Sequence, residues 1–437
     1  MNYILLSGGS GQRLWPLSND VRAKQFLEVF TDAAGRKQSM LQRMHAGIVN
    51  HDDDARVTIA TSLEQKPFIE NQLEAGVELS VEPCRRDTFG AIVLAGAYLR
   101  DAAGVADDEV VVVCPVDSYV EEAYYSILQD MGRVVGQGLA NLALMGIRPE
   151  APSDKYGYII PENQAVVSKV REFKEKPDLE GARTYISQGA LINGGVFAFK
   201  LGYLLERGHE LLDFKDYQDL YDHYADIPRI SFDYALVEKE KNIAVVQYSG
   251  KWKDLGTWDT LTEELQENKS GKAVMEDCQD SYVLNELGVP IIALGLSNIV
   301  VAASPQGILV ADRNKTNGLK EHVNMLHQQT MYAKKSWGSY TVLNASPGSM
   351  TINVELNAGH RMNYHSHQHR NEVWTVVSGE GYTVVDDMRQ PVAPGDVVTI
   401  AAGCRHTVCA TSDMQIIEVQ LGQEISVDDK QLYEDEL

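Results

Sequence analysis

A glycine-rich segment near the N-terminus carries the first residues whose types suggest chemistry. It reads SGGSGQRLWPLS from Ser7 to Ser18, directly after an apolar stretch, and Lys24 follows shortly after it. Glycines let backbone N–H groups approach a phosphate closely, and Arg13 and Lys24 add positive charge. The segment lacks both the GK[ST] ending of a Walker A loop and the GxGxxG of dinucleotide folds. It therefore predicts a phosphate-binding loop of another kind.

The C-terminal quarter of the chain holds a second set of candidate residues. His365, His367 and Glu372 follow the spacing G-x5-HxH-x4-E-x6-G, and His406 lies further along. Histidines two residues apart share one face of a strand, and a carboxylate with a later histidine completes a set of four metal ligands. His369 should point elsewhere. Manganese, iron, nickel and zinc all suit such a site, and a histidine tract without metal is the alternative.

The composition limits what the protein can bind. Its 437 residues include 39 Lys and Arg against 62 Asp and Glu, which gives a formal net charge of −23. Such a chain repels nucleic acids and anionic membranes, so we expect small-molecule substrates and neither of those partners. The chain has no CxxC pair among its five cysteines, no basic signal-peptide segment and no apolar run of about 18 residues, and these features favour a cytoplasmic protein. A homodimer is left open.

The elements that must position these residues alternate in the first half of the chain. Short apolar runs and helical periodicities follow one another, which predicts a mainly parallel sheet with helices on both faces. The expected strands are 3–7, 56–61, 77–81, 109–114 and 141–147, and the expected helices are 39–49, 63–73, 88–100 and 123–135. Asp117 comes just after the most apolar strand, at the carboxyl edge where open α/β sheets bind ligands.

The second half of the chain has a different pattern of residues. Residues 268–335 hold short β-rich segments and a polar connector that is helical near 320–328, which indicates a small β-solenoid-like segment. From residue 336, strands recur at short intervals and predict a β-barrel or sandwich. We therefore expect an α/β domain over 1–267, the β-solenoid-like segment with its connector over 268–335, and a β-barrel domain with an acidic tail over 336–437.

The glycine-rich loop and a series of later motifs carry a family resemblance. The chain resembles the sugar-1-phosphate nucleotidylyltransferases, most closely the mannose-1-phosphate guanylyltransferases, whose loop reads GGxGxRLWPLSR followed by PKQF. Further matching segments occur in the family's order, namely Glu82–Pro83, Arg86–Thr88, Pro115–Asp117, Gly157–Ile159, Phe173–Pro177, Asn193–Phe197, Phe232–Ala235 and Trp252–Trp258. The resemblance implies a Rossmann-like nucleotidyltransferase domain.

The resemblance also implies roles for individual residues. Arg13, Lys24, Asp117 and Asp254 would be catalytic, and the two aspartates would bind Mg²⁺. The nucleotide would be bound by Leu6, Gly8, Gly9, Ser10, Gly11, Arg13 and Lys24, with Glu82, Arg86, Asp87 and Thr88 near the base. The sugar phosphate would be bound by Gly157, Glu175, Lys176 and Asn193. A glutamate can accept two sugar hydroxyls, and an asparagine can both donate and accept, so these residue types suit a hexose.

Several residues depart from the family pattern. Arg86-Asp87-Thr88-Phe89-Gly90 replaces RNTAP, Ser118 stands where histidine is usual, and Ile192 and Gly194 flank Asn193 in place of Trp and Ser. None of these changes removes a phosphate-binding or metal-binding group. These changes concern the positions expected to contact the base and the sugar. We therefore expect GTP and mannose 1-phosphate as substrates, with another base or another hexose as the alternative.

The histidine-rich region resembles the cupin motifs, and the whole chain resembles bifunctional type II phosphomannose isomerase/guanylyltransferases. Those enzymes typically carry Gln at the position of His365 and His at the position of Val373, and their closing segment contains arginines that this chain lacks. Moving a proton between sugar carbons needs a base and a polarising cation. We therefore favour a structural or differently specialised cupin β-barrel, with isomerisation as the alternative.

These observations predict an enzyme that transfers a nucleotidyl group from an NTP to a hexose 1-phosphate, giving an NDP-sugar and pyrophosphate. One alternative also isomerises mannose 6-phosphate and fructose 6-phosphate through the cupin. Another is a non-catalytic regulator that binds sugar nucleotides. Such a regulator could dispense with metal carboxylates, so the presence of both Asp117 and Asp254 argues against it.

Overall fold

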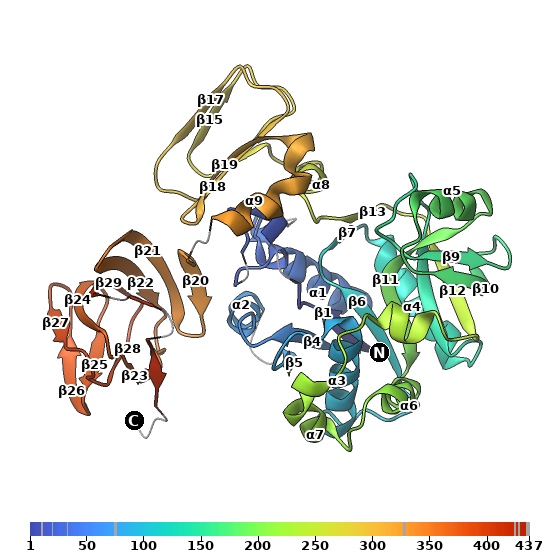
Figure 1. Cartoon of the computed structure of the whole chain (residues 1–437), viewed down its shortest axis with the longest axis horizontal. Helices are drawn as coiled ribbons and strands as arrows, with labels where there is room; N and C mark the ends of the chain where they lie inside the picture. Colours follow the sequence, from blue (N-terminus) through green and yellow to red (C-terminus); the bar gives the residue numbers. More distant parts are fainter. Residues whose placement is uncertain are drawn as a thin grey trace. The chain divides into compact units, whose positions relative to one another are not determined.

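The computed structural model describes residues 1–9, 12–19, 21–32, 34–73, 77–326, 329–423, 425–426 and 429–433. The chain forms two compact units, one made of Met1–Gly11 with Ala23–Gln266 and the other of Gln12–Arg22 with Glu267–Leu437 (Figure 1). In these described ranges, none of the helices combines the length and the apolar character that crossing a membrane requires.

The first unit is built on a nine-stranded sheet in the order β5-β4-β1-β6-β11-β8-β12-β10-β9. The strands are β1 (Asn2–Leu6), β4 (Arg56–Ser62), β5 (Glu78–Glu82), β6 (Val110–Pro115), β8 (Leu142–Ile147), β9 (Tyr158–Pro161), β10 (Val167–Lys174), β11 (Leu191–Lys200) and β12 (Ile243–Tyr248). β6 reads VVVVCP and is buried over most of its length, as expected for a central strand covered on both faces. The predicted α/β architecture is confirmed.

The sheet is mixed, whereas the sequence predicted a mainly parallel one. β1, β4, β5 and β6 run parallel, and so do β8 and β12. β11 runs antiparallel to β6, β8 and β9, and β10 runs antiparallel to β9 and β12. Apolar strands buried on both faces read alike in either direction, so composition could not reveal this difference.

Helices cover the sheet. They are α1 (Met40–His51), α2 (Lys66–Gln72), α3 (Asp87–Asp101), α4 (Ala123–Gly136), α5 (Leu179–Ser187), α6 (Leu201–Leu211), α7 (Tyr217–Asp222) and α8 (Trp258–Thr262). α1 begins with a capping box between Ser39 and Gln42, which satisfies backbone donors at its N-terminus. α3 is apolar on nearly all sides because it packs against the sheet and also against α6 and α7 (Figure 1). The four predicted helices are confirmed within a few residues at each end.

A two-stranded ribbon beside the main sheet connects two distant segments. β7 (Ser118–Val120) pairs antiparallel with β13 (Trp252–Asp254), so that Asp254 lies opposite Ser118. The backbone N–H of Leu255 also donates to the carbonyl of Asp117 at 3.5 Å. This ribbon places the ends of β6 and β13 next to each other.

The second unit begins with stacked short strands, as the sequence predicted. They are β14 (Lys269–Ser270), β15 (Ala273–Glu276), β16 (Tyr282–Asn285), β17 (Ile291–Leu294), β18 (Ile299–Ser304) and β19 (Gly307–Asp312), followed by α9 (Leu319–Met325). β14, β16 and β18 run parallel, as do β15 and β17, which lie side by side in Figure 1. Ala273 pairs with Ile291 and Tyr282 with Val300, each 18 positions apart, so one coil of the solenoid takes about that many residues.

The segment Gln12–Arg22 packs on this solenoid. Ser304 donates its hydroxyl hydrogen to the carbonyl of Pro16 at 2.7 Å, and Arg22 binds both carboxylate oxygens of Glu286 at 2.7 and 3.0 Å. A Cβ added to Gly307 would lie 2.5 Å from the Trp15 ring. The segment is therefore anchored by residues that lie almost 300 positions later in the chain.

The C-terminal part of this unit is a closed β-barrel, as predicted. Its two sheets have the orders β20-β21-β22-β29-β24-β27 and β26-β25-β28-β23-β30. The strands are β20 (Tyr332–Lys335), β21 (Gly338–Ser346), β22 (Ser349–Leu356), β23 (His365–Ser366), β24 (Arg370–Ser378), β25 (Gly381–Val385), β26 (Met388–Val392), β27 (Val397–Ile400), β28 (His406–Ala410), β29 (Met414–Gly422) and β30 (Gln431–Leu432). Apolar side chains from both sheets, among them Trp374 and Val408, form a hydrophobic core in its interior.

Candidate active site and candidate metal centre

Lys24 lies between the two aspartates that the sequence predicts as metal ligands. Its Nζ is 2.9 Å from Oδ2 of Asp117 and 3.0 Å from Oδ1 of Asp254, although Lys24 and Asp254 are 230 positions apart. Burial alone would lower the pKa of Lys24, but the charges of the two aspartates outweigh it and raise that pKa. The aspartate side chains keep 37% and 39% of their surface exposed, so a cation and a substrate can reach them.

The glycine-rich loop is fixed at its start by two buried glutamines. Gln25 donates to the carbonyl of Ser7 at 3.2 Å, and Gln65 donates to the carbonyl of Gly9 at 3.0 Å. Leu6 ends β1, and Gly8 and Gly9 follow it at the carboxyl edge of the sheet. Gln65 had no signal in the sequence, because it lies outside every matched motif. Ser10 and Gly11, which were also predicted to bind phosphate, lie outside the described residues.

Arg13 belongs to the segment that packs on the solenoid. It lies on the 3-10 helix η1 (Gln12–Leu14), where its side chain is exposed while Leu14 and Trp15 are buried. The buried neighbours fix the backbone that carries Arg13, and the guanidinium itself is open to solvent.

Glu82 borders the glycine-rich loop at the end of β5. Its side chain is only 7% exposed, and Tyr224 donates its O–H to Oε2 at 2.6 Å. A Cβ on Gly8 would lie 3.4 Å from Oε1, so the other carboxylate oxygen faces the loop. Burial raises the pKa of Glu82 to about 7. Tyr224 is a further residue that no sequence motif indicated.

The segment after Glu82 connects α3 to the loop that carries Tyr224. Arg86 donates to the carbonyl of Ala225, and Thr88 accepts a hydrogen bond from the backbone N–H of Phe232 at 2.9 Å. Asp87 is exposed and adopts a left-handed φ of 65°. The structure therefore gives Arg86 and Thr88 positioning contacts on the Tyr224 side of Glu82.

The four residues predicted to bind the sugar phosphate form one cluster. The Lys176 Nζ lies 2.8 Å from Oε1 of Glu175, whose side chain is buried, and a Cβ on Gly157 would lie 2.5 Å from Oε2. The backbone N–H of Asn193 donates to the carbonyl of Gly157 at 2.8 Å. A side chain at position 157 would therefore have to displace the Glu175 carboxylate and the Phe173 ring.

Asp233 completes this cluster, although it was not predicted as a site residue. Its Oδ1 accepts a hydrogen bond from Nδ2 of Asn193 at 2.7 Å, and burial together with the charge of Glu175 raises the pKa of Asp233 to about 7. A bulge follows Asn193 in β11, where Gly195 has a φ of 70°, and redirects the strand. Since Phe197 pairs with Val113, this bulge lies beside the end of β6 that leads to Asp117.

The barrel brings three predicted histidines together. The ligand nitrogens of His365, His367 and His406 lie within 4.8 Å of one another, and all three side chains are buried. Each Nδ1 faces a backbone carbonyl, of Asn363, Asp429 and Cys404 respectively. A carbonyl only accepts, so each Nδ1 carries the hydrogen and each Nε2 keeps a lone pair. Burial lowers the pKa of His365 to about 2, which keeps it neutral. His369 is exposed and outside this group, as predicted.

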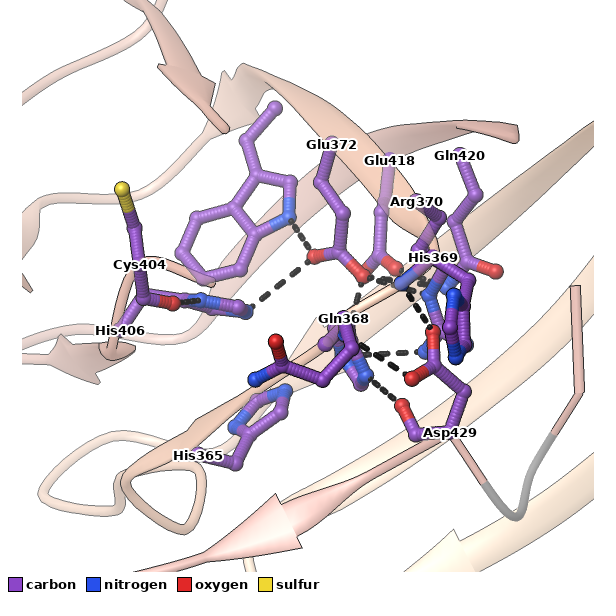
Figure 2. A network of polar contacts seen from close by, with 12 residues as sticks. His365, Gln368, His369, Arg370, Glu372, Cys404, His406, Glu418, Gln420 and Asp429 are labelled. Carbon is purple, nitrogen blue, oxygen red and sulfur yellow. Dashed lines mark hydrogen bonds and ion pairs between the residues drawn. The ribbon is translucent and has the colours of Figure 1, made fainter. Parts of the chain in front are cut away.

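Glu372, the fourth predicted ligand, has a buried arginine as its partner. Figure 2 shows the two side chains together: Nε of Arg370 lies 3.1 Å from Oε1 of Glu372, and Trp374 donates Nε1–H to Oε2 at 3.1 Å. Oε1 is also 3.1 Å from Nε2 of His367, and Oε2 is 3.4 Å from Nε2 of His406. The sequence did not single out Arg370.

These polar groups line a cavity of about 450 Å³ inside the barrel. His365, His367 and Arg370 lie at its wall with Lys335 and Lys430, and apolar side chains such as Trp337 and Met350 cover much of the remainder. A cavity of this size accommodates a small ligand, and its wall carries Lys335, Arg370 and Lys430 together with one carboxylate, Glu418.

Two families match the chain. The family described as "Nucleotidyl transferase" matches residues 2–270, and the family described as "Mannose-6-phosphate isomerase C-terminal" matches residues 320–435. The first match covers more than half of the chain and contains every residue of the first candidate site. The second contains the three histidines.

Relatives with assigned names match almost the whole chain. The "Xanthan biosynthesis protein XanB" of Xanthomonas campestris pv. campestris (strain B100) is 29% identical, over 99% of this chain and 98% of the relative. A "Mannose-1-phosphate guanylyltransferase" of Escherichia coli is 26% identical, over 98% and 97%. A crystal structure from Thermus thermophilus, described as a "mannose-1-phosphate geranyltransferase", superposes with a TM-score of 0.61 at 28% identity, over 75% of this chain and 99% of that one.

Proposed function

Because the chain belongs to the nucleotidyl transferase family, we propose that it transfers the nucleotidyl group of GTP to mannose 1-phosphate or a closely related hexose 1-phosphate. The products would be a nucleotide sugar and pyrophosphate. The observation that carries this proposal is the group formed by Lys24, Asp117 and Asp254 at the carboxyl edge of the sheet. The names of the E. coli and T. thermophilus relatives support mannose 1-phosphate as the acceptor.

The reaction needs positioning and charge neutralisation more than a protein nucleophile. An oxygen of the sugar phosphate forms a bond to the α-phosphorus of the triphosphate, and the bond to the β-phosphate oxygen breaks, so that pyrophosphate leaves. Gly8 and Gly9 would present backbone N–H groups to the triphosphate, while Arg13 and Lys24 would supply positive charge. The sugar phosphate is already ionised at neutral pH.

Asp117 and Asp254 fit a magnesium ion. They are oxygen donors, they approach the same ammonium group at 2.9 and 3.0 Å, and both are partly exposed. Magnesium bound there would neutralise charge on the phosphates. In that complex Lys24 would hold the two carboxylates in place and balance their charge, and its raised pKa keeps it protonated for this role.

Glu82 supports guanine as the base. A guanine ring presents two adjacent donors, N1–H and the N2 amino group, and a carboxylate can accept both. The Oε1 atom of Glu82 faces Gly8, and Oε2 is held by Tyr224. Adenine, uracil and cytosine do not offer that pair of neighbouring donors, so an ionised Glu82 would favour GTP.

The cluster around Glu175 supports a hexose phosphate as the second substrate. Glu175 would accept hydrogen bonds from sugar hydroxyls, and Lys176 would pair with the phosphate. The Asn193 side chain is held by Asp233, and its backbone N–H bonds to the Gly157 carbonyl, so Asn193 fixes the geometry of the cluster.

A substrate panel tests the proposal. Pyrophosphate release would be measured for ATP, GTP, CTP and UTP, each with mannose, glucose and galactose 1-phosphates and with Mg²⁺. We expect GTP with mannose 1-phosphate to give the highest kcat/KM. Turnover with a different pair would identify another base or another sugar as the substrate. No turnover with any pair, in protein shown to be folded, would refute nucleotidyl transfer.

A second activity is favoured by the barrel. The isomerase family match over residues 320–435, together with a cavity that holds His365, His367 and Arg370, supports interconversion of mannose 6-phosphate and fructose 6-phosphate. The three histidine nitrogens fit a transition metal, which would polarise the sugar carbonyl. A coupled isomerase assay after loading with Mn²⁺, Fe²⁺, Ni²⁺ or Zn²⁺ tests this second activity. No isomerisation in any of these metal forms would show that the barrel lacks it.

A further inference from the structure

A buried carboxylate, Glu264, contacts two lysines on the short strand that carries Asp254. We propose that Glu264 is a positioning residue for nucleotidyl transfer: it binds Lys251 and Lys253 together and through them holds Asp254 in place for the metal. This inference rests on the proposed function, because it takes Asp254 as a ligand of Mg²⁺.

The ribbon formed by β7 and β13 has two different faces. Each strand has three residues, and a pair of strands that short is marginal without side-chain support. Side chains alternate along a strand, so Lys253 points to one face of the ribbon and Asp254 to the other. On its face, Asp254 lies 3.0 Å from Lys24. Lys251, two positions before Lys253, shares the opposite face.

Glu264 binds both lysines on that opposite face. Its Oε2 lies 2.7 Å from Nζ of Lys251, and its Oε1 lies 3.0 Å from Nζ of Lys253. The Glu264 side chain is only 3% exposed, and a carboxylate withdrawn from water is stable only with such partners. Since each oxygen faces one ammonium group, a single side chain fixes two positions of the segment that leads to Asp254.

The segment that carries Glu264 is itself firmly anchored. Glu264 follows two residues after the end of α8, and this helix begins with a capping box between Thr257 and Thr260. Trp258 and Leu261 of the helix are fully buried. The carboxylate is therefore attached to a well-packed element and can act as a fixed point for the more exposed strand.

Lys251 also connects the two strands of the ribbon. Its ammonium lies 5.4 Å from the centroid of the Tyr119 ring on β7. Its backbone N–H donates to Oε2 of Glu121, the residue after β7, at 3.1 Å. Because β7 directly follows Asp117, a change at Glu264 should affect the positions of both metal-binding aspartates.

The first test measures how pyrophosphate release depends on free Mg²⁺ at saturating GTP and mannose 1-phosphate. In E264Q both lysines lose their shared counter-ion, so the Mg²⁺ concentration for half-maximal rate should rise by about tenfold or more. The KM for mannose 1-phosphate should stay close to that of wild type, whereas a general loss of structure would change it too.

E263Q is the matched control. It removes the same charge from the neighbouring position, where Glu263 also pairs with Lys253 but is 47% exposed. Exposed ion pairs contribute little, so E263Q should keep the Mg²⁺ dependence of wild type. The comparison therefore separates the contact made by Glu264 from a change in net charge.

The second test does not depend on activity. Hydrogen exchange of the full chain would be measured by mass spectrometry without substrates. In E264Q the amides of residues 251–255 should exchange faster by about tenfold or more, while β1 and the E263Q protein should exchange as in wild type. E264D replaces E264Q should the latter not fold. Its carboxylate is one methylene too short to reach both lysines, so half-maximal Mg²⁺ should rise by about threefold or more.

Several results would overturn the proposal. They are a wild-type Mg²⁺ dependence in folded E264Q or E264D, unchanged exchange over residues 251–255 in E264Q, and an equal effect in E263Q. If wild type shows no turnover with any substrate pair, the proposed function itself is refuted and this inference with it. Turnover in wild type together with any of the first three results would refute the role of Glu264 alone.

Discussion

Gly157 offers a sharp test of the sugar-phosphate cluster. In Gly157→Ala the new Cβ would lie 2.5 Å from Oε2 of Glu175 and 2.8 Å from the ring of Phe173. An ordinary contact begins at 3.4 Å, so the carboxylate has to retreat by 3.4 − 2.5 = 0.9 Å. Glu175 is only 5% exposed and is paired with Lys176, so this movement also shifts the ammonium that would meet the phosphate.

The size of the effect follows from that displacement. Moving a positioning group by about 1 Å costs on the order of 10²-fold in rate. This corresponds to about 2.7 kcal/mol of transition-state stabilisation. We therefore expect kcat/KM for the hexose 1-phosphate to fall by about 10²-fold in Gly157→Ala. The KM for the nucleoside triphosphate should remain close to that of wild type, because Gly157 and Glu175 belong to the sugar side of the site.

The assay is pyrophosphate release, with the sugar phosphate varied at saturating nucleotide and then the reverse. Gly136→Ala in α4 is the matched control, because its Cβ would meet only Val110, at 3.6 Å. Glu175→Gln provides a second variant of the same contact should Gly157→Ala not fold. An unchanged kcat/KM for the sugar phosphate in a folded Gly157→Ala protein would show that the Glu175 carboxylate does not contact this substrate.

Three further predictions concern the nucleotide side and the solenoid. Asp117→Asn should reduce kcat by about 10²-fold or more and raise the Mg²⁺ concentration required, and near-normal turnover would remove its metal role. Burial raises the pKa of Glu82 to about 7, so its carboxylate becomes charged as the pH rises from about 6 to 8; the KM for GTP should fall over that range, and in E82Q it should stay flat. A wild-type KM that is flat over the same range would argue against base recognition by Glu82. Gly307→Ala should lower the free energy of unfolding by about 1–3 kcal/mol, because its Cβ would lie 2.5 Å from the Trp15 ring; calorimetry would compare it with Gly288→Ala, which meets nothing within 4 Å.

The sequence predicts local structure well where one pattern permits one structure. The valine run of β6 was recognisable because a strand buried on both faces requires apolar side chains along its length. Strand direction was not recognisable. β11 runs antiparallel between β6 and β8, and its pairing depends on partners 45 to 90 positions away, which leave no trace in its own composition.

The candidate active site was predicted from the order of the motifs along the chain more than from local residue patterns. Asp117 and Asp254 meet because β7 and β13 pair, and each of these strands has three residues. A strand that short has too few positions to show an alternation. Tyr224 and Gln65 support Glu82 and Gly9 through single hydrogen bonds, so only the folded structure identifies them.

Arg370 shows how a local signal can be present and still be missed. The family resemblance leads us to expect arginines in the closing segment, and this chain has none there. Yet Arg370 is two residues before Glu372 on β24, and the side-chain period of a strand puts both on one face. Because Glu372 was expected to face the metal, the same expectation places Arg370 at the cavity wall. An arginine two positions before a buried candidate ligand on the same strand should therefore be counted among the residues of the cavity.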